Sequence, residues 1–418
     1  MRQSCYKFWT ILLLALLLRV IAAIAIDQLV TQAGRTFLIE GDANGYWELG
    51  QHIAAGEEYS IFQPPRRVLR TPGFPLLLAA SIKVFGESVF AASLVMAVVG
   101  TGCCWLTWLL ARKLFDESTA LWAMLLVAVS PLQIGSNVQI LSETCFSFGL
   151  LLCLLALARL LQQATAAGCG RTAFTNGILT GLTVLIRPGW ILWAGLSSLI
   201  VVLFGQMTFM KRILCAALIC NGCFVALLPW AWRNHEVTGH WIFTSLWSGP
   251  SLYDGLHAGA TGASDMAFVD NEDAYSTMSE FDANAHYKKR AIDFVEENPR
   301  RTVELAVLKA GRYLSPSLNA AGFSGGVFSV FCTLWYFVLT LLILAGVLNL
   351  RHNLAYVALL AGPFLQFLLV HMVFVGSIRY RLPVEFPLSI LAAHGLVALR
   401  QRWNHRARRN CEPQSGVN

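Results

Sequence analysis

The sequence predicts an all-α polytopic membrane protein, a bundle of about ten transmembrane helices with short amphipathic surface helices in two outer loops. Hydrophobic residues make up 56% of the 418 residues and charged residues only 13%, whereas about 25% of a typical soluble domain is charged. The mean hydropathy is +0.58. A membrane-crossing helix needs about 20 mostly apolar residues. Apolar runs near this length, several of them shorter, occupy residues 8–26, 88–110, 119–131, 144–160, 173–186, 189–204, 213–232, 327–348, 354–374 and 383–399.

The distribution of charge fixes the expected orientation of these spans. If the N-terminus is cytoplasmic, the cytoplasmic segments are rich in Arg and Lys and nearly free of acids, and most Asp and Glu residues lie in the opposite segments. This is the arrangement that the positive-inside rule requires. Both termini are therefore expected in the cytoplasm. The net charge of +7 follows from this topology, and no nucleic-acid partner is predicted.

Two apolar segments need a separate interpretation. Residues 74–85 are apolar enough for a span, but counting them would place every later basic loop outside, so we expect an interfacial or re-entrant segment. The N-terminus resembles a signal peptide. Because Arg19 interrupts its apolar run and further spans follow, we expect an uncleaved first helix.

The predicted organisation is one membrane domain, residues 1–399, followed by a basic cytoplasmic tail, residues 400–418. Two polar segments, 27–87 and 233–326, form loops on the same outer face. In the first loop, Asp42 begins a short amphipathic helix that Gly56 ends. The second loop starts with a Gly/Ser-rich stretch and ends in two surface helices that break at Asn298-Pro299. None of the 11 cysteines falls in these loops, so no disulfide framework is predicted.

Ionisable residues gather at the predicted outer ends of the spans. Such groups are costly beside a bilayer and are functional candidates for that reason. The span that precedes Arg187 has only about 14 residues, or roughly 21 Å of helix, so Arg187 is expected below the outer surface. The candidates are Asp42, Arg70, Glu143, Arg187, Arg233, Arg379 and Arg381.

A carboxylate and several arginines beside lipid suit the chemistry of a sugar linked to a polyprenyl phosphate. The lipid tail of such a donor lies in the bilayer, its phosphate leaves as an anion, and arginine binds phosphate by charge-assisted, often bidentate hydrogen bonds. An attacking hydroxyl needs a base, which a carboxylate supplies.

Several motifs occur in an order and spacing that resemble a known superfamily. They are GDANGYWELGQHIAAGEEY, RTPGFPLLLA, SE at 142–143, LIRPG, PWAWRN and IRYRLPVEFPLSIL, spread over residues 8–399. The pattern resembles the GT-C polytopic glycosyltransferases, in the group of protein mannosyltransferases, aminoarabinose transferases and Rgt-type lipopolysaccharide glycosyltransferases. The resemblance implies a GT-C-like bundle, a catalytic Asp at Asp42, a polyprenyl-phosphate-sugar donor and inversion at the anomeric carbon. It also implies that the stretch Arg379 to Pro383 lies near the donor phosphate.

The sequence departs from some relatives in the first loop. There Asp42 is followed by Ala43, not by a second acid, so Glu143 is our candidate for the supporting acid. Asp42-Ala43-Asn44 is not a DxD motif, and no His/Asp cluster has ligand spacing. A bound divalent metal is compatible with the sequence but is not predicted.

The resulting hypothesis is an inverting glycosyltransferase of the inner (plasma) membrane that acts at the periplasmic or extracytoplasmic face. Its partners would be the lipid-linked sugar, a hydroxyl-bearing acceptor (glycan, lipid or protein) and the bilayer. Asp42 would be the general base, supported by Glu143. The expected phosphate-binding residues are Arg379, Arg381, Arg187 and Arg70, and further pocket candidates are Tyr380, Arg233 and His371.

Simpler interpretations stand beside this hypothesis. Asp42 could serve only as a helix N-cap, the arginines could be interfacial anchors, and His371 could be a buried imidazole with satisfied hydrogen bonds. A transporter or lipid flippase also places charges in a bundle, although no internal repeat is found. A noncatalytic assembly subunit is a third possibility. The sequence does not identify the sugar or the acceptor.

Overall fold

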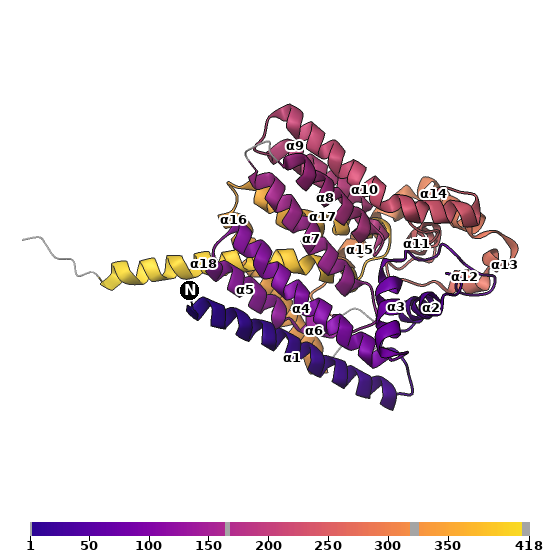
Figure 1. Ribbon diagram of the computed structural model, residues 1–418, viewed down its shortest axis with the longest axis horizontal. Helices are drawn as coiled ribbons and strands as arrows, with labels where there is room; N and C mark the ends of the chain where they lie inside the picture. Colours follow the sequence, from indigo (N-terminus) through magenta and orange to yellow (C-terminus); the bar gives the residue numbers. More distant parts are fainter. Residues whose placement is uncertain (1, 164–167, 318–325, 412–418) are drawn as a thin grey trace, which may run out of the picture.

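The computed structural model describes residues 2–163, 168–317 and 326–411, and the elements named in this part of the chain are all helices. Figure 1 shows the long helices lying beside one another in a single bundle. Their bounds are α1 Arg2–Gln32, α2 Asp42–Ala55, α3 Gly73–Phe85, α4 Val89–Leu114, α5 Glu117–Ala128, α6 Pro131–Ser136, α7 Glu143–Gln162, α8 Cys169–Val184, η1 Pro188–Ile191, α9 Leu192–Phe204, α10 Phe209–Thr238, α11 Ser248–Gly255, α12 Ala267–Asn271, α13 Ala274–Thr277, α14 Glu280–Glu297, α15 Pro299–Leu314, α16 Gly326–Asn349, α17 Leu354–Val373, η2 Ile378–Tyr380 and α18 Leu382–Cys411.

Each of the ten predicted spans overlaps one main helix, and these helices are α1, α4, α5, α7, α8, α9, α10, α16, α17 and α18. Within the described ranges, 7 helices are long and apolar enough to cross a membrane. The other three are shorter, with 12 residues in α5, 16 in α8 and 13 in α9. The prediction of an all-α polytopic fold is confirmed, and the short spans are short helices in the structure.

The two ends of the bundle differ in character. The N-terminus of α1 and the C-terminal half of α18 lie at the same end, and α2, α3 and α11–α14 gather at the other end (Figure 1). We call this second end the loop end, because it carries helices from both predicted outer loops. The placement of both loops at one end agrees with the parity of the predicted spans. Which side of the membrane the loop end faces stays a prediction.

Close backbone contacts hold α3 beside α2 at the loop end. A Cβ atom added at Gly50 of α2 would lie 2.9 Å from the Cβ of Leu78 in α3. The start of α3 also meets the end of α8, because the amide of Gly73 donates to the carbonyl of Leu185 over 2.8 Å. The segment 74–85, which the sequence predicts to be interfacial or re-entrant, is thus a helix that packs on the loop-end helix α2. These contacts bring the residues just before α3 next to the turn that follows α8.

The core lies around α7, which packs on α4, α8 and α18. Phe146 of α7 contacts Trp190 of η1 edge to face, and Trp190 stacks on Trp193 with ring centroids 4.7 Å apart. Helices α8 and α10 approach each other through glycines, since a Cβ added at Gly177 would lie 2.2 Å from the carbonyl oxygen of Ile219. Membrane helices commonly approach closely at small residues.

Three local expectations can be compared directly with the structure. The first-loop helix begins at Asp42 and ends at Gly56, as predicted, but Gly41 is its N-cap residue and donates its amide to Asn44 Oδ1 over 3.1 Å. The expected helix break occurs at Asn298 and Pro299, between α14 and α15. The predicted tail boundary at residue 400 is not a structural break, because α18 continues to Cys411. Residues 412–418 of the tail lie outside the described residues.

Candidate active site

A cavity of about 330 Å³ lies at the loop end, between the two outer loops and the ends of the spans. Its size falls in the range of about 300–1,000 Å³ that is common for ligand pockets. Six of the predicted site residues line it, and they come from α2, the segments before α3 and after α8, α17 and the 379–380 turn. These residues are Asp42, Arg70, Arg187, His371, Arg379 and Tyr380.

Asp42 opens α2 and turns its carboxylate toward two arginines. Arg70 Nη2 donates to Oδ1, and Arg379 Nη1 donates to Oδ2 over 2.8 Å. Burial acts to raise the pKa of Asp42, but the nearby charges of Arg70 and Arg379 outweigh it and hold this pKa well below its usual range. Asp42 is therefore ionised, with both oxygens engaged by cations, and it does not act as the helix N-cap.

Arg379 continues the chain of contacts to a second, deeper carboxylate. Its Nε donates to Glu143 Oε1, and Arg187 Nη1 approaches the same oxygen within 3.1 Å. The Glu143 side chain is only 3% exposed, compared with 31% for Asp42. We call the five residues Arg70, Asp42, Arg379, Glu143 and Arg187 the ion-pair network. It contains three guanidinium groups and two carboxylates, which leaves one positive charge in excess.

The loop that carries Arg70 is fixed on both sides. Tyr59 donates its hydroxyl to the carbonyl of Arg70 over 3.1 Å. The Glu280 carboxylate of α14 accepts the backbone amides of Arg67, over 2.8 Å, and Val68, over 3.1 Å. The second outer loop thus holds the first loop in the position from which Arg70 reaches Asp42.

Tyr380 and His371 form an aromatic surface beside the network. Their rings stack with centroids 4.1 Å apart and an interplanar angle of 5°. His371 is buried, and its Nδ1 lies 2.9 Å from the carbonyl oxygen of Val375. The guanidinium of Arg187 lies 5.0 Å from the centre of the Tyr380 ring. His371 is thus a buried, hydrogen-bonded imidazole, and it also lines the cavity.

Arg381 does not line the cavity, in contrast to the sequence-based expectation. Its side chain is fully buried, pairs with Glu385 at 2.8 Å, and donates to the carbonyls of Tyr313 and Ser315 over 2.9 and 2.8 Å. Residues two apart in a helical turn do not face the same direction, so Arg379 and Arg381 point to different parts of the molecule. Arg381 fastens the end of α15 to the start of α18.

Arg233 also has a structural setting that differs from the expected one. Its guanidinium donates to the carbonyls of Arg67, over 2.6 Å, and Tyr59, over 3.1 Å. It is not among the residues that line the cavity. Arg233 therefore braces the first outer loop against the end of α10.

A further wall of the cavity, the hydroxyl-rich wall, comes from a segment that the sequence predicts to be a Gly/Ser-rich loop. This wall consists mainly of hydroxyl groups, one carboxylate and one tryptophan, supplied by Thr244, Ser245, Trp247, Ser248, Ser251, Asp254 and Ser264. The three-residue spacing of Ser248, Ser251 and Asp254 is a signal that could have placed them on one face of a helix.

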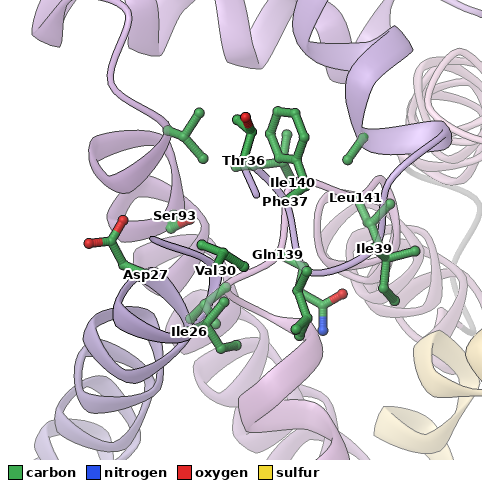
Figure 2. Close-up of a pocket in the computed structure, with 14 residues that line it drawn as sticks. Ile26, Asp27, Val30, Thr36, Phe37, Ile39, Ser93, Gln139, Ile140 and Leu141 are labelled. Atoms are coloured by element: carbon green, nitrogen blue, oxygen red, sulfur yellow. The ribbon is translucent and has the colours of Figure 1, made fainter. Parts of the chain in front are cut away.

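A much smaller hollow lies beside the end of α1. Figure 2 shows its mostly apolar lining, with Asp27 and Gln139 among the labelled side chains. Its volume is about 30 Å³, which is room for a water molecule and too little for a sugar.

Within the described ranges, no group of three or more His, Cys, Asp or Glu side chains is arranged to hold a metal ion.

Comparisons with known proteins bear on the fold. The family model described as dolichyl-phosphate-mannose-protein mannosyltransferase matches residues 69–232, and no curated protein matches the chain. The oligosaccharyltransferase AglB from Archaeoglobus fulgidus, solved with an inhibitory peptide and a dolichol-phosphate, is 13% identical with a TM-score of 0.57, and the match covers 99% of this chain and 53% of AglB. A second A. fulgidus oligosaccharyltransferase structure, with a tethered acceptor peptide, is 14% identical with a TM-score of 0.58, covering 95% of this chain and 50% of that one.

A structure of ArnT from Cupriavidus metallidurans bound to undecaprenyl phosphate is 14% identical with a TM-score of 0.47, covering 93% of this chain and 77% of that one. This chain spans about half the length of the archaeal enzymes that it matches. The solved structures show that this chain shares the fold of these polytopic membrane enzymes, and the family model covers less than half of the chain. The resemblance to GT-C glycosyltransferases that the sequence predicted is confirmed, and the predicted enzyme class, a glycosyltransferase, agrees with the matched family.

Proposed function

We propose that the protein is an inverting membrane glycosyltransferase that moves a sugar from a polyprenyl-phosphate donor to a hydroxyl acceptor at the outer face of the membrane. One observation carries this proposal: Asp42 and three arginines meet in a single cavity at the loop end of a GT-C bundle. The dolichol-phosphate in the AglB structure supports a lipid-phosphate ligand for this fold.

The excess positive charge of the ion-pair network suits the leaving phosphate. Arginine binds phosphate through two parallel hydrogen bonds, and donors aimed at a charge that develops in the transition state lower the barrier. Arg70 and Arg379 are each partly exposed in the cavity, with 20% and 23% of their side chains accessible. In this proposal they receive the phosphate, and Arg187 adds positive charge from deeper in the cavity wall.

Asp42 is the proposed general base. Because two arginines pair with its carboxylate, it can accept a proton only after these pairings weaken. A carboxylate with a strongly lowered pKa accepts a proton poorly, because basicity falls with pKa. A donor phosphate that draws Arg379 and Arg70 toward itself weakens their hold on Asp42, and this raises the pKa of Asp42. Donor binding would thereby produce the base that deprotonates the acceptor hydroxyl.

Glu143 has a different proposed task from the one that the sequence suggested. It contacts Arg379 and Arg187 but is nearly buried and is not a lining residue of the cavity. We assign it the role of positioning these two arginines. It then supports Asp42 indirectly, by holding the cations that bind the phosphate.

The geometry favours transfer over transport. A transporter places its binding charges near the bilayer midplane, between repeated halves. Here the ion-pair network lies at the loop end, next to helices α2 and α11 outside the long spans. Inverting transfer by a single displacement needs one base that the acceptor hydroxyl can reach. Asp42 lines the cavity at the loop end and suits this role.

Transfer from defined donors to cell-envelope acceptors tests the proposal. Purified protein in nanodiscs would be given radiolabelled polyprenyl-phosphate sugars and an envelope extract from a strain that lacks the protein. We expect labelled product with the wild type and at least a 100-fold lower rate with Asp42→Asn, in line with the loss of a general base of about 10²–10⁴-fold. Equal rates for the two proteins would remove Asp42 from the mechanism. Movement of labelled lipid across a vesicle membrane, without sugar transfer, would support a flippase.

A further inference from the structure

The hydroxyl-rich wall of the cavity contains a carboxylate in a very different setting from Asp42. Ser248, Ser251 and Asp254 lie three residues apart on α11, and all three line the cavity. Residues at this spacing share one face of a helix. Helix α11 thus presents two hydroxyl groups and one carboxylate to the space in which Asp42 and its arginines also lie.

Asp254 is buried and is held by neutral donors. Its side chain is 3% exposed, Ser264 donates its hydroxyl to Oδ2 over 2.7 Å, and the amide of Asp265 donates to Oδ1 over 2.7 Å. A carboxylate offers about four acceptor positions, so each oxygen keeps one for a further donor. At Asp42, in contrast, each oxygen faces a guanidinium group.

Helix α11, which carries Asp254, packs against other helices of the protein. A Cβ atom at Gly255 would lie 2.5 Å from the carbonyl oxygen of Phe374, so α11 packs directly against the end of α17. The buried Lys309 of α15 donates its ammonium to the neighbouring carbonyl of Val373 over 2.7 Å. A rigid support of this kind holds Asp254 in place when a ligand enters.

We propose that Asp254 and Ser251 form the subsite that binds the hydroxyl groups of the transferred sugar, while the phosphate lies against the arginines of the ion-pair network. This inference rests on the proposed function. The Asp254 carboxylate accepts hydrogen bonds from adjacent ring hydroxyls, and Ser251 contributes a hydroxyl that both donates and accepts. The same carboxylate repels a sugar acid, so the substrate class is a polyhydroxylated sugar that carries no acidic group.

Binding measurements with defined lipids separate this subsite from the phosphate site. The probes are undecaprenyl phosphate, undecaprenyl-phosphate glucose, undecaprenyl-phosphate mannose and undecaprenyl-phosphate glucuronate, each titrated into protein in nanodiscs. The wild type is expected to bind at least one neutral-sugar lipid more tightly than bare undecaprenyl phosphate, and to bind the glucuronate lipid more weakly. Asp254→Asn should lower the affinity for the preferred sugar lipid by about 10- to 100-fold, as expected for hydrogen bonds to a charged group, and leave the affinity for undecaprenyl phosphate unchanged.

Ser251→Ala is the second variant, since it removes one hydroxyl from the same helix face, and it should lower the affinity for the sugar lipid by about 5-fold. Unchanged binding of undecaprenyl phosphate demonstrates that each variant is folded. The subsite is overturned if both variants bind the sugar lipid as the wild type does, or if the wild type does not discriminate among the lipids. A wild type that binds no lipid phosphate at all would instead contradict the proposed function on which the subsite rests.

Discussion

Replacement of Glu143 by Gln tests whether the ion-pair network behaves as a buried unit. The change keeps the shape of the side chain and removes its charge. Arg187 then loses the carboxylate that it approaches at 3.1 Å, and Arg379 retains only Asp42. Breaking a buried pair by removing one partner costs about 3–5 kcal/mol. Because the Gln oxygen still accepts one hydrogen bond, we expect a loss of about 3 kcal/mol, at the lower end of this range.

The chain offers a closely matched control in Glu117→Gln. Glu117 is also the first residue of a helix, α5, and it also lies 3.1 Å from an arginine, Arg112, but the two side chains are 33% and 58% exposed. An exposed pair contributes about 0–1 kcal/mol. The stability of both variants would be measured by titration with sodium dodecyl sulfate in mixed micelles, followed by tryptophan fluorescence. Equal losses for the two variants would refute the argument that burial makes the Glu143 network stronger.

Three further predictions concern the base, Arg381 and the helix packing. Arg70 and Arg379 hold the pKa of Asp42 below its ordinary value of 3.8, so Asp42 stays ionised in the free enzyme. The pH profile of kcat/KM should therefore show no loss of rate from protonation of Asp42 between about pH 5 and 8, whereas the profile of kcat, measured with donor bound, should show such a loss on the acid side. Identical profiles would argue against release of Asp42 by the donor. Arg381→Ala should lower the thermal unfolding temperature but leave the donor KM of the folded protein unchanged, and a raised KM would return Arg381 to the phosphate site. Gly177→Ala should destabilise the protein by about 1–3 kcal/mol through overpacking. Gly195→Ala is the control and should not destabilise the protein in this way, because a Cβ added at Gly195 meets nothing within 4 Å. Equal losses of stability in the two variants would contradict the close approach of α8 and α10.

Much of the fold could be predicted because it depends on local properties of the sequence. The length of each apolar run predicts a helix, and the alternation of basic segments predicts which loops share an end of the bundle. The five members of the ion-pair network were also predicted as candidates, since each is an ionisable residue at the end of an apolar run. Their convergence at the loop end follows from the parity of the spans.

The rest of the site depends on side-chain direction and on packing between distant segments. The sequence pattern did not reveal that Arg379 and Arg381 point to different parts of the molecule, or that Arg233 braces the first loop. Asp254 was missed because the Gly/Ser-rich composition around it predicts a loop, whereas packing of α11 against α17 makes it part of the cavity wall. Tertiary packing overrides local preference at these positions.

The proposed mechanism requires that the phosphate of a lipid donor binds the arginines that hold Asp42. A cryo-electron microscopy structure of the protein in nanodiscs with undecaprenyl phosphate tests it most directly. We expect phosphate oxygens within hydrogen-bonding distance of Arg379, and a longer separation between Arg379 Nη1 and Asp42 Oδ2, which lie 2.8 Å apart in the present structure. A phosphate bound outside this cavity, or one bound inside it with the Arg379–Asp42 pair still closed, would rule out release of Asp42 by the donor.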